Sequence, residues 1–414
     1  SRKVPSCIHC KNCDIMNGFG GAGAFSDGKY NFTTRFGGWL NDYLDDDYIM
    51  QLIEYVDDIN ISFGATDERF STETSAAKEI SRAALGHDLH LLSASVKHLG
   101  TENNKQILTK MFDSLSKKLE LVCNANVTAI QKNTNEYLLT MKDGKVLKCK
   151  YLVAAPGRSG AEWFSEQCRS LGLSLINNQV DIGVRVELPA TIFEHITDAM
   201  YEAKFLYRTK QYGDIVRTFC MNPYGYVVSE NVDGIITVNG HSYTDQKLRS
   251  DNTNFALLVS NRFTQPFNEP YQYGKRIASL SNMLGGGVLV QRFGDLIKGK
   301  RTNEHRLGQS FTRPTLKATP GDLSLVLTKR HLDNIVEMIH VLDNIAPGTA
   351  NHDTLLYGVE VKFYSSRLQL STELETPLAN FFAIGDGAGI TRGLSQAAAS
   401  GVHVARAIAK RMDK

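Results

Sequence analysis

The 414-residue chain lacks any uninterrupted apolar run that approaches ~18 residues, the length at which a transmembrane helix is expected. Its opening residues, Ser1-Arg-Lys-Val-Pro, also lack the apolar core of a secretory signal peptide. Lys and Arg number 46 against 44 Asp and Glu, and no basic run or basic-aromatic patch is visible. These absences favour a cytoplasmic protein with neither a membrane nor a nucleic-acid partner.

Two further absences concern the ends and the cysteines. The first residue is not methionine, so we expect the chain to begin inside a longer gene product. The seven cysteines are an odd number, which argues against a disulfide framework. Length alone predicts two to three domains, at roughly 150 residues each.

Three of the cysteines, Cys7, Cys10 and Cys13, form a C-x2-C-x2-C pattern with His9 between the first two. Such spacing lets thiolates converge on one metal or iron–sulfur centre. The fourth ligand of a ferredoxin-type run would fall at Asn17, which cannot serve as a thiolate. A metal site, a redox-active thiol set and a structural cluster all remain open, and no metal is predicted.

The most informative segment lies near the end of the chain. A short apolar strand over 381–384 leads into Gly385-Asp-Gly-Ala-Gly389, and a helix of small residues starts near Gly393. Glycines allow close backbone approach, and the free N–H groups of a helix start attract negative charge. Asp386 should repel phosphate, so we expect it to accept hydrogen bonds from hydroxyl groups. The candidate cofactor-binding residues here are Gly385, Asp386, Gly387, Gly389, Gly393, Leu394, Ser395 and Gln396.

A second glycine-rich segment covers residues 18–29. Gly18, Gly20 and Gly23 match the G-x-G-x-x-G spacing, but the polar residues before them do not predict the strand that a dinucleotide fingerprint needs. We therefore interpret the segment as a loop whose backbone approaches a cofactor. Its candidate binding residues are Gly21, Ala22, Gly23, Ala24, Phe25, Ser26, Asp27, Gly28 and Lys29.

Between these segments the first part of the chain alternates helices and strands. Apolar periodicity predicts helices over 48–63, 75–85 and 104–119, and strands over 89–96, 119–130, 136–141 and 145–149. A buried strand from Tyr151 then enters the turn Ala155-Pro156-Gly157-Arg158, whose four residues are further cofactor-binding candidates expected to act together with the turn at 385–389. Arg158 has two interpretations, a clamp for a phosphate or substrate and a solvated surface charge.

The central region, about 175–345, has a different pattern. It predicts strands over 181–187, 215–221, 224–229 and 234–239, and two mostly helical stretches over 253–263 and 329–342. This composition is typical of a β-rich domain that faces a substrate. A last strand, over 354–362, returns the chain to the first domain.

Six segments, taken in order, resemble those of one family. They are the glycine loop after the cysteines, His98-Leu-Gly-Thr, Ala155-Pro-Gly-Arg-Ser, Asp181-Ile-Gly-Val-Arg-Val-Glu, Gly358-Val-Glu and the segment 385–401. The family is that of the uncharacterised FAD-dependent dehydrogenases, within the glutathione-reductase-like two-dinucleotide-binding superfamily. The resemblance implies an α/β fold, an FAD-binding Rossmann-like domain with an inserted mixed β-rich substrate domain. The implied boundaries are 1–174 and 351–414 for the FAD-binding domain and 175–350 for the substrate domain.

One departure from the family is clear. Its members open with a strand, a Gly-x-Gly-x-x-Gly turn and a helix that hold the ADP diphosphate, and this chain has none of them. A true loss of that unit would weaken FAD binding severely, because the helix-start phosphate site would be missing.

The resemblance also implies roles for individual residues. Asp386 would accept hydrogen bonds from the ribitol, the helix from Gly393 would stabilise negative charge at flavin N1 and O2, and Val127 would hold the adenine edge. The candidate catalytic residues are Lys29, Glu360, Lys362 and Arg392.

The predicted activity is a two-electron transfer between FAD and an unidentified small-molecule substrate. The alternatives are a flavin reductase coupled to NAD(P)H or another electron donor, and a flavin- or metal-binding sensor that uses the N-terminal cysteines.

Overall fold

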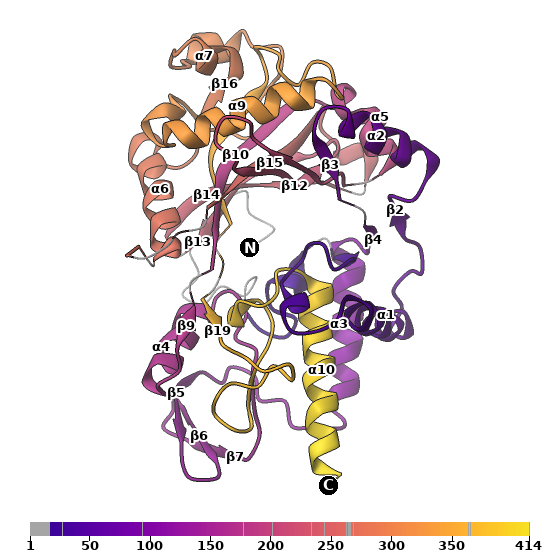
Figure 1. Cartoon of the computed structure of the whole chain (residues 1–414), viewed down its shortest axis with the longest axis vertical. Coiled ribbons are helices and arrows are strands. Elements are labelled where there is room, and N and C mark those ends of the chain that lie inside the picture. Colours follow the sequence, from indigo (N-terminus) through magenta and orange to yellow (C-terminus); the bar gives the residue numbers. More distant parts are fainter. Residues whose placement is uncertain are drawn as a thin grey trace. The chain divides into compact units, whose positions relative to one another are not determined.

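The computed structural model describes residues 17–413 except positions 27, 93, 177, 201, 233, 244, 262, 264, 265, 268, 363 and 365. The chain forms two compact units (Figure 1). The first unit combines the chain up to residue 70 with 94–178 and 364–414, and the second combines 71–93 with 179–363. The Cys7, Cys10 and Cys13 cluster and Asp27 lie outside the described residues.

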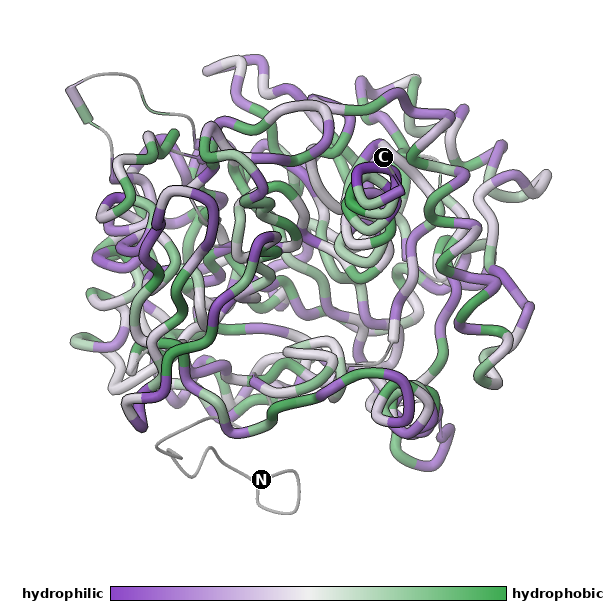
Figure 2. Tube along the Cα trace, turned by 90° about the horizontal axis from the view of Figure 1, so that it is seen from below, coloured by the Kyte–Doolittle hydropathy of each residue, from purple (hydrophilic) through white to green (hydrophobic). Residues whose placement is uncertain are grey.

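The first unit is built around long helices and a parallel strand pair. Helix α1 (Asp46–Ser62) packs against α10 (Leu394–Met412) and buries Ile49, Leu52, Ile53 and Val56, as their helical spacing predicts. Strand β20 (Phe381–Ala383) pairs in parallel with β8 (Leu152–Ala154) inside the same hydrophobic core. The last turn of α10 is hydrophilic, with Lys410 and Arg411 (Figure 2), and the other end of this helix lies at the candidate site described below.

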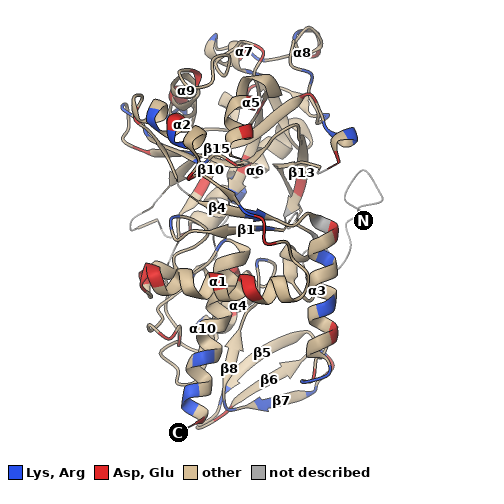
Figure 3. Cartoon of the chain, turned by 90° about the vertical axis from the view of Figure 1, so that its right-hand side faces the viewer, with Lys and Arg blue, Asp and Glu red and all other residues tan. Residues whose placement is uncertain are grey.

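The remaining elements of the first unit surround this core. The predicted meander is present as β5, β6 and β7, although its first strand begins at Val127 rather than near Leu119. Acidic residues gather along α1, and basic residues at the end of α10 (Figure 3). The bounds are β1 (Lys29–Phe32), β4 (Ser95–His98), α3 (Thr101–Leu115), β5 (Val127–Lys132), β6 (Tyr137–Met141), β7 (Val146–Cys149), α4 (Ala161–Ser170), β9 (Leu175–Ile176), β19 (Arg367–Leu368) and the 3-10 turns η1 (Gly21–Phe25), η2 (Leu40–Asp42) and η5 (Asp386–Ala388).

The second unit contains an eight-stranded sheet in the order β17-β16-β18-β10-β15-β12-β11-β3. Its pairs are antiparallel except for β16 with β17. The strands are β3 (Leu89–Leu91), β10 (Val180–Pro189), β11 (Phe205–Arg208), β12 (Ile215–Asn222), β15 (Asn252–Asn261), β16 (Leu289–Arg292), β17 (Thr319–Pro320) and β18 (Leu355–Lys362). The mixed α/β character predicted from the sequence is confirmed.

The two faces of this sheet differ in chemistry. On β10, Val180, Ile182, Val184, Val186 and Leu188 belong to the main hydrophobic core, which also takes residues from α5, α6 and α9. The alternate residues, Asp181, Arg185 and Glu187, are polar and fully buried. A hairpin of β13 (Tyr226–Val232) and β14 (Ile235–His241) packs near the Leu355 and Tyr357 end of the polar face. The helices are α2 (Ser75–Leu85), α5 (Ala190–Ala199), α6 (Pro270–Gly285), α7 (Phe293–Ile297), α8 (Glu304–Gly308) and α9 (Lys329–Asp343).

Two sequence-based expectations are wrong in this region. The helical stretch expected over 253–263 is strand β15, which lies between β10 and β12. Both of its faces are buried, so its apolar residues are continuous rather than alternating, and such a run is ambiguous between helix and strand. The single strand expected over 89–96 is two strands, β3 and β4, in different sheets.

Candidate cofactor site

The candidate site is built around the ends of two parallel strands in the first unit. Ala383 of β20 pairs with Ala154 of β8, so the turns that follow both strands leave the same edge. A Cβ at Gly387 would lie 2.3 Å from the carbonyl oxygen of Gly157, so only glycine fits there. The two glycine turns expected to act together therefore pack against each other. Ligands of α/β folds commonly bind at this carboxyl edge.

Asp386, at the start of η5, is held by partners from both turns. Thr391 Oγ1 donates a hydrogen bond of 2.6 Å to Asp386 Oδ1, and Arg158 Nε lies 3.4 Å from Oδ2. The Arg158 side chain is 45% exposed, whereas that of Asp386 is 18% exposed. The ion pair orients the carboxylate and leaves it accessible enough to accept hydroxyl donors. Arg158 thus has a partner within the turn pair, and its role as a clamp stays a prediction.

The glycine-rich loop lies against the start of α10. A Cβ at Gly23 would approach the Leu394 side chain to 2.4 Å, which explains the need for glycine at this point. The Gly23 carbonyl accepts hydrogen bonds of 2.7 Å from both Asn104 Nδ2 and Ser26 Oγ. The structure thereby brings Gly23 of the glycine loop against Leu394 at the start of α10, two candidates that the sequence assigned separately to the cofactor.

Polar groups at the N-terminus of α10 have no partner within the described part of the chain. Gly393 is the N-cap residue, and no side chain caps the helix. Ser395 and Gln396 are each only 3% exposed, and Ser395 Oγ and Gln396 Oε1 have no hydrogen-bond partner among the described residues. Gln396 Nε2 donates to the Phe36 carbonyl at 3.2 Å, which fixes the amide plane. A buried polar atom without a partner costs free energy, so such atoms indicate a missing ligand or water.

Two asparagines that the sequence analysis missed extend this set. Asn31 Oδ1 and Asn104 Oδ1 are also buried without a partner among the described residues. Asn104 binds Gly23, and Asn31 lies near Gly393, so both flank the start of α10. A ligand that offers several hydrogen-bonding groups to this start would satisfy all four side chains. No spacing pattern marks these asparagines along the chain, because each contact joins segments more than 70 residues apart.

A paired glycine segment, Gly37-Gly38, was missed as well. Gly38 forms an antiparallel bridge with Thr391, and the Arg392 N–H donates to the Gly37 carbonyl at 2.8 Å. The loop between η5 and α10 is therefore fixed by backbone hydrogen bonds. This arrangement positions the helix start before any ligand binds.

The four residues predicted to be catalytic fall into both units. Lys29 opens β1 opposite His98, and the Arg392 guanidinium lies 4.4 Å from the centre of the Tyr364 ring in the first unit. Glu360 and Lys362 belong to β18 in the second unit. Val127, predicted to hold the adenine edge, opens β5 opposite Met141 in the meander.

Glu360 is the centre of a buried ionic cluster. It is fully buried between Arg185 Nη1, at 3.1 and 3.2 Å, and Lys362 Nζ, at 2.8 Å. Arg185 also donates to Asn254 Oδ1 at 2.8 Å and to the Cys220 carbonyl at 2.5 Å. Because Glu360 already neutralises two cations, it suits positioning better than proton transfer.

The described residues form neither a metal-binding cluster nor a membrane-spanning helix. Within the described ranges, no group of three or more His, Cys, Asp or Glu side chains is arranged to hold a metal ion. Across the same ranges, none of the helices combines the length and the apolar run that crossing a bilayer requires.

Comparison with known proteins identifies one domain. Residues 179–363, which form most of the second unit, match the family model described as FAD-dependent protein, C-terminal domain-like. A protein of Clostridium beijerinckii, described as uncharacterized, is 28% identical over 422 residues, covering 97% of this chain and 71% of that protein.

Solved structures show only distant likenesses. Salicylate hydroxylase in its substrate complex is 12% identical, with 91% of this chain and 71% of that chain covered at a TM-score of 0.36. Glycine oxidase from Geobacillus kaustophilus is 10% identical, with 92% and 85% covered at a TM-score of 0.34. TM-scores this low carry no argument about fold or activity. The domain match is the informative finding, and it supports FAD as the cofactor of this protein, as the sequence predicted.

Proposed function

We propose that the protein is an FAD-dependent oxidoreductase that transfers two electrons between the flavin and a small organic substrate. One observation carries the proposal beyond the domain match. The start of α10, between the two glycine turns and the loop over 21–25, gathers four buried side-chain atoms that have no hydrogen-bond partner among the described residues: Asn31 Oδ1, Asn104 Oδ1, Ser395 Oγ and Gln396 Oε1. A flavin with its ribitol presents many donors and acceptors, so it fits such a site.

The residues of the first unit have distinct roles in this proposal. The uncapped N–H groups of Leu394, Ser395 and Gln396 favour negative charge at the helix start. Asp386, oriented by Thr391 and Arg158, accepts hydrogen bonds from hydroxyl groups of the cofactor chain. The glycine loop over 21–25 allows backbone approach to the pyrophosphate, and Lys29 follows it at the start of β1. Bound FAD would supply the site that accepts and returns a hydride equivalent.

The finer parts of the proposal concern family and architecture. We place the protein among glutathione-reductase-like flavoproteins, whose Rossmann-like domain includes an ADP-binding strand, turn and helix. Lys362 in the second unit and Arg392 in the first remain separate candidates for binding or proton transfer, and Glu360 positions Lys362.

The deciding experiment is cofactor analysis of the protein expressed from its complete gene. The purified protein should be yellow and release FAD in close to one equivalent on denaturation. Asp386→Ala should lose most of the bound FAD, whereas Asp143→Ala, at an exposed turn of the meander, should retain it. A folded, colourless protein that cannot be reconstituted with FAD would contradict the proposal.

The same preparation separates the two redox alternatives. Rapid bleaching of the flavin by NADPH or NADH in anaerobic stopped-flow measurements would identify a nicotinamide-coupled reductase. Slow bleaching by both, with reduction by an organic donor, would support the dehydrogenase. A protein whose flavin no donor reduces would instead fit the sensor alternative.

A further inference from the structure

The polar face of the second unit's sheet carries three cations around one aromatic ring. Lys204 Nζ lies 5.2 Å from the centre of the Phe219 ring, Lys362 Nζ 5.8 Å, and Arg217 Cζ 5.9 Å. The three cations come from different parts of the chain: Lys204 lies just before β11, Arg217 lies in β12 and Lys362 lies in β18. Phe219 and Arg217 are partly exposed, whereas Lys204 and Lys362 are 8% and 9% exposed. Contacts within about 6 Å are those in which a cation and an aromatic ring attract each other.

Each cation is paired with a carboxylate that is buried more deeply. The Arg217 side chain is 23% exposed and that of its partner Asp181 is 0% exposed. For Lys362 and Glu360 the values are 11% and 0%. For Lys204 and Glu202 they are 10% and 5%. In each pair the cation is the more exposed member, most clearly at Arg217. A ligand that approaches this surface meets cationic groups first.

The backbone below this layer departs from regular pairing. The register shifts between Gly183 and Val184 on β10, and between Phe219 and Asn222 on β12. Between those last two, Cys220 has a positive φ of 49°, which is costly for a residue other than glycine. Its carbonyl oxygen is turned to accept a hydrogen bond from the fully buried Arg185. Bulges and such backbone conformations are concentrated at functional sites, where they redirect side chains.

From these observations we propose that the substrate of the oxidoreductase is an organic monocarboxylate, bound by Lys362 and Arg217 with its carbon skeleton against Phe219. The inference rests on the proposed function, since it takes the ligand of this surface to be the substrate. A monoanion is favoured over a phosphate dianion because each cation already has one carboxylate partner. Lys362 and Arg217 are binding residues in this assignment, and Glu360 and Asp181 position them.

The test uses a fluorinated probe whose binding does not depend on the flavin. Binding of 4-fluorobenzoate to the purified protein is followed by 19F NMR, with 4-fluorobenzamide as the uncharged isostere. Loss of a hydrogen bond to a charged group corresponds to roughly a tenfold change or more. We expect the parent protein to bind the amide at least about tenfold more weakly than the acid. We expect Arg217→Gln and Lys362→Gln each to bind the acid at least about tenfold more weakly than the parent does.

Matched variants make the result specific. Lys247→Gln, at an exposed lysine of the same unit, should bind the acid like the parent, and Arg217→Lys should recover most of the binding lost in Arg217→Gln. Thermal unfolding of every variant separates lost binding from lost folding. Equal binding of acid and amide, no binding of the acid, or loss of affinity in Lys247→Gln to the same extent would overturn the proposal. Tighter binding of 4-fluorophenyl phosphate than of the acid would also overturn it, in favour of a phosphate ligand.

The outcome is distinguishable from failure of the proposed function. A colourless protein that binds 4-fluorobenzoate through Lys362 would retain the carboxylate site and refute the flavoenzyme. A yellow protein that does not bind 4-fluorobenzoate would retain the flavoenzyme and refute the carboxylate site.

Discussion

The start of α10 in the first unit and the polar face of the sheet in the second differ in how their buried polar groups are satisfied. At the helix start, four buried side-chain atoms have no partner within the described residues. On the sheet, Arg185 and Lys362 each bond to Glu360 within 3.2 Å. The first arrangement offers those four atoms to a ligand, whereas the charged groups of the second bond to protein partners, with the neighbouring Asn254 Nδ2 left without a partner among the described residues. Substitutions in the two regions should therefore affect different measurements.

The largest effect on stability is expected at Glu360. In Glu360→Gln, Arg185 and Lys362 lose the only carboxylate that both contact in the described cluster. Breaking a buried ion pair on one side typically costs about 3–5 kcal/mol, because it leaves an uncompensated buried charge. Urea unfolding followed by circular dichroism would measure the loss.

Glu304→Gln is the control for that change, because Glu304 is exposed in the first turn of α8. It should cost no more than about 1 kcal/mol through the helix dipole. Asp386→Ala completes the comparison, since it should remove FAD with little change in the urea midpoint of the flavin-free protein. Equal destabilisation by the two glutamate variants would show that the cluster on the sheet is not self-stabilising.

A smaller, pH-dependent effect is expected at His331 in α9. Burial lowers the pKa of its imidazole from 6.5 to about 4, and the ring is held by Thr328 and Asn261 Oδ1. Between these two pH values the unfolded chain binds a proton that the folded chain does not. Stability should therefore fall as pH drops from about 6.5 to 4, by up to roughly 3 kcal/mol.

His331→Gln removes this titration and should flatten the pH dependence of unfolding in that window. His352→Gln, at an exposed histidine of the same unit, should leave the dependence unchanged. An unaltered slope in His331→Gln would mean that another group is responsible.

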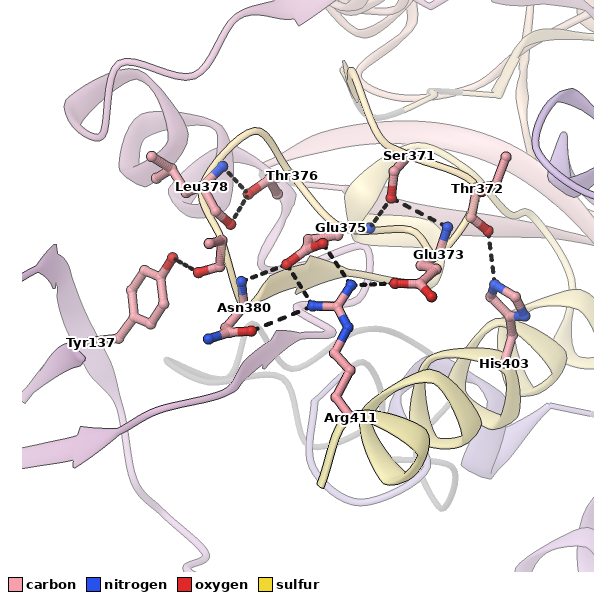
Figure 4. Close-up of polar contacts among 11 residues, drawn as sticks. Tyr137, Ser371, Thr372, Glu373, Glu375, Thr376, Leu378, Asn380, His403 and Arg411 are labelled. Carbon is pink, nitrogen blue, oxygen red and sulfur yellow. Dashed lines mark hydrogen bonds and ion pairs between the residues drawn. The ribbon is translucent and has the colours of Figure 1, made fainter. Parts of the chain in front are cut away.

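The smallest effect is expected at the far end of α10. Arg411 forms ion pairs with Glu375, at 2.7 Å, and Glu373, and its side chain also reaches Asn380 (Figure 4). The hydrogen bonds from Arg411 hold the pKa of Glu375 below its usual value. Exposed ion pairs contribute up to about 1 kcal/mol each, so Arg411→Gln should lower stability only slightly.

Hydrogen exchange of single segments detects the effect of Arg411→Gln more sharply than global unfolding does. Hydrogen exchange should become faster over residues 371–380, the loop that leads into β20, whereas Lys410→Gln should leave it unchanged. Because the folded pKa of Glu375 is lowered, the stabilisation should be present near neutral pH and be lost as pH falls through that pKa. Exchange that matches the parent would show that Arg411 does not hold this loop.

The sequence predicted best what is decided locally. Helices α1 and α10 follow from apolar spacing within one segment, and the glycine turns at 157 and 385–389 from their composition. Strand β15 was misassigned because burial on both faces removes the alternation that marks a strand. The strand over 181–187 was recognised, but its polar side was not expected to be buried.

Contacts between distant segments account for the rest. Arg158 and Asp386 were both candidates, yet their pairing joins residues 228 positions apart and has no sequence signal. Asn31 and Asn104 became candidates only when the fold placed them beside the start of α10. Roles of single residues in binding or catalysis remain predictions for the experiments above.

The division of the chain into segments has a consequence for synthesis. The polypeptide passes between the units four times, after residues 70, 93, 178 and 363. All of the second unit is therefore synthesised before β20, the turn at 385–389 and α10. The proposed flavin site joins segments made before and after that unit, so the loop over 21–25 must wait for the start of α10 to complete the site. A nascent chain that ends before residue 380 would contain the whole sequence of the sheet domain but not the strand, turn and helix start of the proposed site.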